Sequence, residues 1–275
     1  MVIQHNIAAI NSYRNLSINQ NALSKNLEKL SSGYKINRAG DDAAGLAISE
    51  TMRSQINGLN QAVNNANDAV GLIQTAEGAM TETHSMLQRM KTLATQAANG
   101  TYTSTARGNI KAEIDALNKE ITRIATTTEF NGEKPLNPDT MRGANLTFFI
   151  GASADTTNAM TVAQMTMTAE ALTINNIAVD TTTNAFNAMA SIDAAIEKVS
   201  TYRATLGAAQ NRLEHTVNNL KVTSENITSA ESRIRDTDMA DEITAYTKNN
   251  ILLQAAQSML SQANSMPQGV LSMLQ

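Results

Sequence analysis

The sequence has no cysteine and no tryptophan, and it is poor in proline, glycine and aromatic residues. Without Cys there is no disulfide, no thiolate nucleophile and no thiolate metal site. Aromatic residues make up 3% of the chain, and 3 Pro and 13 Gly are few for 275 residues. This composition argues against ring-lined pockets and against a fold of many short strands, and it favours long helices.

Charge is also scarce. The 21 Lys and Arg against 25 Asp and Glu give a formal net charge of -4, which leaves no basic excess to neutralise phosphates. We therefore expect no nucleic-acid partner. No apolar stretch approaches the roughly 20 residues that cross a bilayer, and residues 1–11 show no cationic segment followed by an apolar run. We expect neither a membrane partner nor a cleaved secretory signal, so that export would use another route.

What the sequence does have is helical periodicity, which begins near the amino terminus. A helix-packing seam, with spacings of four and three residues, runs through Ala9, Tyr13, Leu16, Gln20, Leu23, Leu27 and Leu30. Gln20 is its polar member, and it either sets the register of a helix pair or is a tolerated, partly solvated position. Residues 31–42 break the period with two glycines, and Asp41 or Asp42 offers an N-cap for the next helix.

The next periodic segment spans 43–98, about 80 Å of helix, which has to pack along a rod. After a turn at Gly100 a shorter helix is expected to fold back beside it, marked by Ile110, Ile114, Leu117, Ile121 and Ile124. Phe130-Asn131-Gly132 and two prolines end helical character, and alternation within 146–179 predicts short strands and loops. The helical period then returns before Ile192 and holds as far as Ile234.

A final seam runs through Leu252, Ala256, Met259, Ala263, Met266, Val270 and Met273. Pro267 lies inside it, so we expect a kink or a fresh helix start there. Burying each large apolar residue of this seam would contribute roughly 2 to 3 kcal/mol of stability. That gain does not offset the backbone entropy lost when residues 239–275 become ordered, which costs roughly 1 kcal/mol for each residue. We infer that the chain ends order on assembly with other copies, through these side chains: Leu16, Leu23, Leu27, Leu30, Leu252, Met259, Met266, Val270 and Met273.

The predicted fold is therefore mainly α. It is a long antiparallel helical rod or coiled-coil bundle formed by both chain ends, with a small β-hairpin and loop region in the middle.

Residues 30–49, LSSGYKINRAGDDAAGLAIS, closely resemble the hallmark of the bacterial flagellins. The resemblance continues through 64–78 (NNANDAVGLIQTAEG), 87–99, 130–132, 206–213 (LGAAQNRL), 217–220, 231–238 and the end from Ile251. It covers about four fifths of the chain, and several long matches in the right order are far more specific than any one of them alone.

The resemblance implies a structural subunit that self-assembles into the bacterial flagellar filament used for motility. It implies an inner coiled coil from 1–42 with 234–275, and an outer helical rod from 43–233 with a small β region at about 132–180. The region after Gly132 leaves no room for separate outer variable domains.

The resemblance also implies how the subunit reaches its place and what it meets there. The flagellar type III apparatus would export it unfolded, to the extracellular filament and without a cleaved signal peptide. Its partners would be other copies of itself, an export chaperone at the carboxyl-terminal helix, and filament cap and hook-junction proteins.

Residues 87–96, LQRMKTLATQ, are similar to the flagellin helix face that Toll-like receptor 5 recognises in animals. The matching positions are Arg89, Leu93, Gln96, Glu113 and Arg212. A packing role stands beside the receptor role, because Leu93 and Arg212 would equally serve contacts between subunits. Leu117 stands where strongly stimulating members have Arg, so the resemblance implies binding more than strong signalling.

No motif points to catalysis, to a metal or to a cofactor. Asp41 and Asp42 suit helix capping better than acid–base chemistry, because adjacent side chains at a helix start point in different directions. His5, His84 and His215 are isolated, and the sequence has no His-Glu-x-x-His, Gly-x-Ser-x-Gly or phosphate-binding glycine motif. We expect no enzyme, and the metalloprotease that some flagellins carry in the variable region has neither motif nor space here.

Rival readings remain. A hook–filament junction protein shares the helical ends, but it should be longer and match less well around 31–49. A secreted helical effector or adhesin that uses the same export route does not explain matches at both ends. An enzyme would cleave casein or a peptide, where we expect no activity. Ser and Thr residues within 139–180 are candidate glycan carriers in any of these readings.

Overall fold

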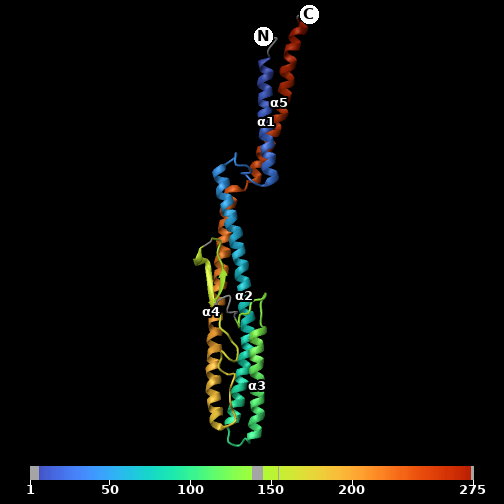
Figure 1. The fold of residues 1–275 in the computed structure, drawn as a ribbon. Helices are drawn as coiled ribbons and strands as arrows, with labels where there is room; N and C mark the ends of the chain where they lie inside the picture. Colours follow the sequence, from blue (N-terminus) through green and yellow to red (C-terminus); the bar gives the residue numbers. More distant parts are fainter. Residues whose placement is uncertain (1–5, 138–144, 154, 274–275) are drawn as a thin grey trace. The chain divides into compact units, whose positions relative to one another are not determined.

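The computed structural model describes residues 6–137, 145–153 and 155–273, with backbone only at 268 and 270–273. Its elements follow in the order α1 (Ile7–Ser32), α2 (Ala43–Ala98), α3 (Ser104–Thr127), β1 (Asn145–Phe149), a short 3-10 helix η1 (Thr156–Asn158), β2 (Ala159–Ala163), α4 (Thr182–Arg235) and α5 (Met239–Met273) (Figure 1). Long helices on both sides of a small antiparallel hairpin confirm the predicted mainly α fold.

The chain forms two compact units, each built from segments far apart in the sequence. Unit 1 comprises residues 1–54 and 225–275, and unit 2 comprises residues 55–224. Because α2 and α4 each cross a boundary, both helices contribute to both units.

Capping groups in the sequence set the ends of the first two helices. The Asn6 side chain accepts the Ala9 N–H at the start of α1, and Gly33 ends that helix with a left-handed φ of 75°. Asp42 Oδ1 accepts the Gly45 N–H at 2.9 Å, which confirms the predicted capping role at the start of α2. Asp41 instead accepts the N–H groups of residues 38 and 37, and these bonds lower the pKa of its carboxyl group.

The predicted end of helical character at Phe130-Asn131-Gly132 is a tight turn. Asn131 and Gly132 both have positive φ, 51° and 81°, as the two central residues of a type I′ turn require. Phe130 and Glu133 exchange two backbone hydrogen bonds across it, at 2.9 and 3.0 Å. Beyond it, β1 and β2 pair antiparallel in a register that sets Asn145 opposite Ala163 and Phe149 opposite Ala159.

Unit 2 holds most of the core. Helices α2, α3 and α4 lie side by side (Figure 1), and the segment from Met160 to Val179 fills the space against them. The ion pairs Lys91–Asp193 at 2.6 Å and Glu77–Arg203 at 3.5 Å fix the antiparallel register of α2 and α4. The largest fully buried side chains of the three helices include Ile73, Met80, Leu87, Met90, Ile114, Ile121, Ile192 and Tyr202.

The last helix differs from one expectation. Helix α5 continues through Pro267, so no fresh helix begins there. A proline inside a helix removes one backbone hydrogen bond, and α5 tolerates that loss close to its end.

Candidate assembly surface

Helices α1 and α5 of unit 1 pack antiparallel along a seam in which polar layers alternate with apolar ones. The less exposed residues of α1 include a row at spacings of three and four, formed by Ala9, Ser12, Leu16, Asn19, Leu23, Asn26 and Leu30. The matching residues of α5 are Glu242, Tyr246, Asn249, Leu253, Ala256, Leu260, Ala263 and Pro267. Three of the seven α1 positions therefore bring Ser or Asn to the helix pair.

The observed seam agrees with the predicted seam at every second position, and at the positions between them it is shifted by one residue. Leu16, Leu23 and Leu30 face α5 as expected, but Tyr13, Gln20 and Leu27 are exposed. Of the two readings of Gln20, the structure therefore supports the solvated position. On α5, Leu252, Met259 and Met266 are exposed, and their neighbours Leu253, Leu260 and Pro267 take the inner positions. The side chains of Val270 and Met273 lie outside the described residues.

As a result, many large apolar side chains of the terminal helices point outward. Eleven of them on α1 and α5 are between 40% and 65% exposed: Ile7, Ile10, Tyr13, Ile18, Leu27, Met239, Ile243, Ile251, Leu252, Met259 and Met266. Among the described residues of unit 1, only Ile36 and Ala263 are buried hydrophobic residues. Burying the outward side chains would stabilise an assembly by on the order of 10 kcal/mol. Apolar exposure on this scale marks an interaction surface.

Asn26 provides the buried polar layer of the seam. Its side chain is 9% exposed. In the amide orientation that satisfies its neighbours, the nitrogen donates to Ala22 O at 2.9 Å and to Glu242 Oε1 at 3.3 Å. The oxygen then accepts from the Tyr246 N–H and from Asn249 Nδ2. A buried amide that finds partners in one alignment only sets the register of a helix pair at a cost in stability.

The linker that follows α1 and the linker that precedes α5 lie at the same end of this antiparallel pair and are bonded to each other, which the sequence did not predict. The Lys35 N–H donates to Arg235 O at 2.7 Å, and the Thr237 N–H donates to Gly33 O at 3.0 Å. The Arg235 side chain also pairs with Glu50 at 2.6 Å. Arg235 is the main cause of the lowered pKa of the Glu50 carboxyl group, through its hydrogen bond. No local pattern links groups so far apart in the sequence.

Unit 2 carries the five residues predicted for receptor binding, and it brings some of them together. Arg89 of α2 pairs with Glu113 of α3 at 2.8 Å, and Gln96 donates to the Tyr102 hydroxyl at 2.7 Å. Leu93, between them on α2, is only 2% exposed and belongs to the core. Arg212 is exposed on α4, but the α2/α4 register places it about 30 Å along the rod from Arg89.

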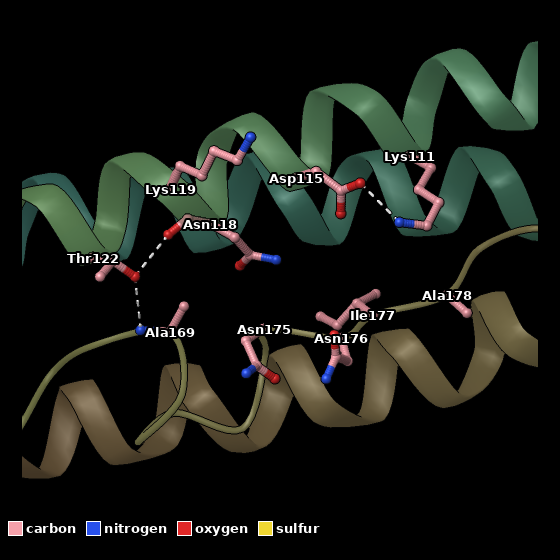
Figure 2. A pocket seen from close by; sticks show the side chains of 10 residues that line it. All are labelled: Lys111, Asp115, Asn118, Lys119, Thr122, Ala169, Asn175, Asn176, Ile177 and Ala178. Atoms are coloured by element: carbon pink, nitrogen blue, oxygen red, sulfur yellow. Dashed lines mark hydrogen bonds and ion pairs between the residues drawn. The ribbon is translucent and has the colours of Figure 1, made fainter.

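A groove of about 630 Å³ lies between α3 and the segment 169–178 (Figure 2). The Thr122 hydroxyl donates to Asn118 O at 3.0 Å and accepts the Ala169 N–H at 3.3 Å, as Figure 2 shows. The buried Asn118 side chain donates to Ile174 O at 2.8 Å. These bonds fasten the extended segment to α3. The Lys111–Asp115 ion pair on the groove wall is 2.7 Å long and offers no nucleophile beside a base.

Within residues 6–137, 145–153 and 155–273, no three His, Cys, Asp or Glu side chains gather as metal ligands. Among the helices described, none is both long enough and apolar enough to cross a membrane.

Comparison with known proteins agrees with the helical ends. Residues 3–139 match the bacterial flagellin N-terminal helical region, and residues 189–274 match the bacterial flagellin C-terminal helical region. The flagellin of Bacillus subtilis (strain 168) is 51% identical and that of Halalkalibacterium halodurans 48% identical, each over 100% of both chains. The crystal structure of Bacillus cereus flagellin is similar with a TM-score of 0.51 and 31% identity, over 61% of this chain and 94% of that one.

Proposed function

The chain belongs to the bacterial flagellin family, as a structural subunit of the flagellar filament that serves motility, and from that premise we propose which of its surfaces join the copies. The outward apolar faces of α1 and α5 are the assembly surface. Within this surface, Leu27, Leu252, Met259 and Met266 contact other copies directly. Leu16, Leu23 and Leu30 hold the helix pair together, and the assembly role predicted for Val270 and Met273 stays a prediction because their side chains lie outside the described residues.

One observation carries this proposal. The seam inside the chain combines its leucines and Tyr246 with Ser, Asn, Ala, Glu and Pro layers, whereas every described isoleucine and methionine side chain of α1 and α5 is exposed, together with Tyr13, Leu27 and Leu252. A helix pair designed to be stable alone would put its largest apolar residues inside. Because α1 and α5 instead expose many of their large apolar residues, the helix pair is weak within one copy and can bind other copies.

The proposal extends to the plan of the filament. Residues 1–42 with 234–275 form the inner helical part, and residues 43–233 form the outer rod with its small β region. The well-filled core of α2, α3 and α4 suits an outer part that keeps its shape without neighbours. The seam between α1 and α5 buries few apolar residues, which suits an inner part whose apolar side chains are buried by other copies in the polymer.

The same surface accounts for the proposed partners. An export chaperone would cover Ile251, Leu252, Met259 and Met266 on α5 before assembly, because these side chains would otherwise remain exposed to water. A weak helix pair also suits export in an unfolded form through the flagellar type III apparatus, without a cleaved signal. The filament cap and the hook-junction proteins would meet the same faces at the two ends of the polymer.

We also propose that Toll-like receptor 5 binds the face formed by α2 and α3. The exposed pair Arg89–Glu113 and the exposed Gln96 supply the polar contacts. Leu93 supports this face from beneath, and Arg212 belongs to a second contact further along the rod. Catalysis forms no part of the proposal, and purified protein should leave casein uncleaved.

Adjacent residues of α5 provide a matched test of the assembly surface. Met259 is 63% exposed, while Leu260 lies at the seam. Met259→Ser should leave the unfolding curve of the monomer unchanged and raise the critical concentration for filament formation about tenfold. Leu260→Ser should instead destabilise the monomer. Equal assembly of Met259→Ser and the wild type, by sedimentation and negative-stain microscopy, would remove α5 from the interface.

Deletion provides a coarser test. A chain without residues 251–275 loses four of the outward apolar side chains on α5, and it should stay a soluble monomer in ammonium sulfate. Unit 2 should still melt as in the full chain. Normal filaments from this truncated chain would show that the end helix has no part in assembly.

A further inference from the structure

Unit 2 concentrates its phenylalanines around one groove. The chain has 4 Phe, and Phe130, Phe148 and Phe149 all line a groove of about 530 Å³ between α2 and the β1 strand. Phe130 packs against α2 at Gly71, where a side chain would lie 3.5 Å from the ring. Phe149 is 42% exposed, and its carbonyl accepts from Asn65 Nδ2 at 3.0 Å. The groove is therefore anchored to α2 and presents aromatic surface to solvent.

The fourth phenylalanine lies elsewhere and is mostly exposed. Phe186 is 62% exposed on the second turn of α4, while its neighbours Ala185 and Ala188 are buried. Among the described residues of unit 2, no large apolar side chain is more exposed. The residues one turn away on α4, Thr182, Thr183, Met189 and Ala190, carry no charge, so they bring no like charge to Asp68 and Glu133 of the groove.

Phe186 and the groove are separated along the rod. The Thr95 hydroxyl lies 3.8 Å from Met189 Sδ, so the start of α4 is level with the end of α2. Asp68, at the middle of the groove, is 27 residues before Thr95 on α2, which corresponds to about 40 Å. Figure 1 shows this spacing: the hairpin lies partway along α2 and α4, and α4 starts at the end of unit 2 beside the α2–α3 turn. Phe186 cannot reach the groove of its own copy.

We propose that Phe186 of one copy docks in the Phe130, Phe148 and Phe149 groove of a second copy, displaced by about 40 Å along the rod. Two different surfaces on one unit make a heterologous contact, and repeating it by a fixed displacement gives an open polymer rather than a closed dimer. Aromatic rings favour offset or edge-to-face packing on other rings, so the groove suits this occupant better than an aliphatic side chain. The contact rests on the proposed function, and it adds an outer interface to the one made by α1 and α5.

Cysteine cross-linking tests this contact cleanly, because the chain has no Cys of its own. Thr147 is an exposed member of the groove lining. Filaments of Thr183→Cys with Thr147→Cys keep the Phe186 ring, and after mild oxidation they should give a ladder of covalent multimers on a non-reducing gel. The control, Thr183→Cys with Thr81→Cys, puts the second thiol at an exposed position on α2, away from the groove, and should give no ladder. Filaments that form but show no ladder above this control would overturn the contact and leave filament assembly untouched.

Substitutions at Phe186 provide a second test of the proposed contact. Because the side chain is exposed, neither Phe186→Leu nor Phe186→Asp should change the helical content or the melting of the monomer. Phe186→Asp should raise the critical concentration about ten- to hundredfold, and Phe186→Leu much less. Normal filament assembly of the Phe186→Asp variant would contradict the proposed role of Phe186 at the interface. Wild-type chains that form no filaments at all would instead contradict the proposed function.

Discussion

The guanidinium group of Arg235, the last residue of α4, lies over the ring of Tyr34 with its carbon 4.7 Å from the ring centroid. Tyr34 belongs to the linker that joins α1 to α2, so the contact ties together two segments far apart in the sequence. The backbone bonds from Lys35 to Arg235 and from Thr237 to Gly33 close the same junction. A small group of contacts thus fixes where the helix pair of unit 1 begins.

Arg235→Lys should open this junction. Lysine keeps the charge but loses the planar group that stacks on Tyr34 and reaches Glu50. We expect the free energy of local opening to fall by about 1 to 2 kcal/mol, which speeds amide exchange at Lys35 and Thr237 about five- to thirtyfold. Arg233→Lys is the control, since that exposed side chain bonds to Ser229 on its own helix. Unchanged exchange in Arg235→Lys would leave the stacking without a structural role.

Acid should loosen the same junction. The hydrogen bond from Arg235 lowers the pKa of the Glu50 carboxyl group, so the folded state favours the charged form. A lowered pKa contributes stability above the ordinary glutamate pKa of about 4.3, and that stability is lost as the pH falls through the folded value. The protection of the Lys35 amide, which is its intrinsic exchange rate divided by its measured rate, should therefore fall below about pH 4.3 in the wild type. In Glu50→Gln this acid-dependent step should become smaller, and the remainder belongs to Asp41, whose pKa is lowered by its backbone hydrogen bonds in the same linker.

Glu120→Gln offers the matched control for that measurement. The hydrogen bond from Arg123 likewise lowers the pKa of Glu120, but the pair lies on α3, in unit 2. This variant should retain the acid step at Lys35. An identical response from Glu50→Gln and Glu120→Gln would mean that the acid step arises elsewhere.

The sequence predicts the elements of this fold well, because its helices are long and their boundaries carry strong local signals. The segment predicted for 43–98 coincides with α2 (Ala43–Ala98), whose start is capped by Asp42 as expected. The tight turn at Asn131-Gly132 likewise follows from two residues that tolerate positive φ. The length of a helix and the residues that begin and end it are local properties of the chain, so they can be predicted from a single sequence.

The direction of each apolar face could not be predicted in the same way. On α1, Leu16, Leu23 and Leu30 belong both to the observed seam and to the predicted one. The remaining layers are either Ser12, Asn19 and Asn26 or Tyr13, Gln20 and Leu27, and hydrophobicity alone favours the second set. That choice is correct only for a helix whose strongest partner is in its own chain. Here the polar set faces α5, and the other set is exposed.

Asn26→Leu should separate stability from specificity in the helix pair. A buried leucine gains more than the lost amide bonds contribute, so the monomer should gain about 1 to 2 kcal/mol of stability. It also loses the layer that sets the register, and we expect fewer and less regular filaments. Gln20→Leu changes an exposed position on the same helix and should leave the register intact. Urea unfolding and negative-stain microscopy measure the two effects, and a less stable Asn26→Leu monomer would contradict this account.

The receptor face calls for variants that distinguish contact from support. Arg89 and Glu113 form an exposed ion pair, and such pairs stabilise a fold by about 0 to 1 kcal/mol. Arg89→Ala should therefore leave unit 2 folded and weaken receptor binding in a direct binding assay. Leu93 is 2% exposed, and Leu93→Ala should cost about 2 to 5 kcal/mol of stability through the cavity it leaves.

These two variants have opposite signatures. If Leu93 acts only from beneath, then Leu93→Ala should bind the receptor normally at temperatures where unit 2 is still folded, and its binding should fail only as the unit melts. Arg89→Ala should bind weakly at every temperature, because a missing contact cannot be restored by cooling. Leu93→Ala protein that is folded but binds as weakly as Arg89→Ala would instead make Leu93 a direct contact, which would require local opening of the core around it.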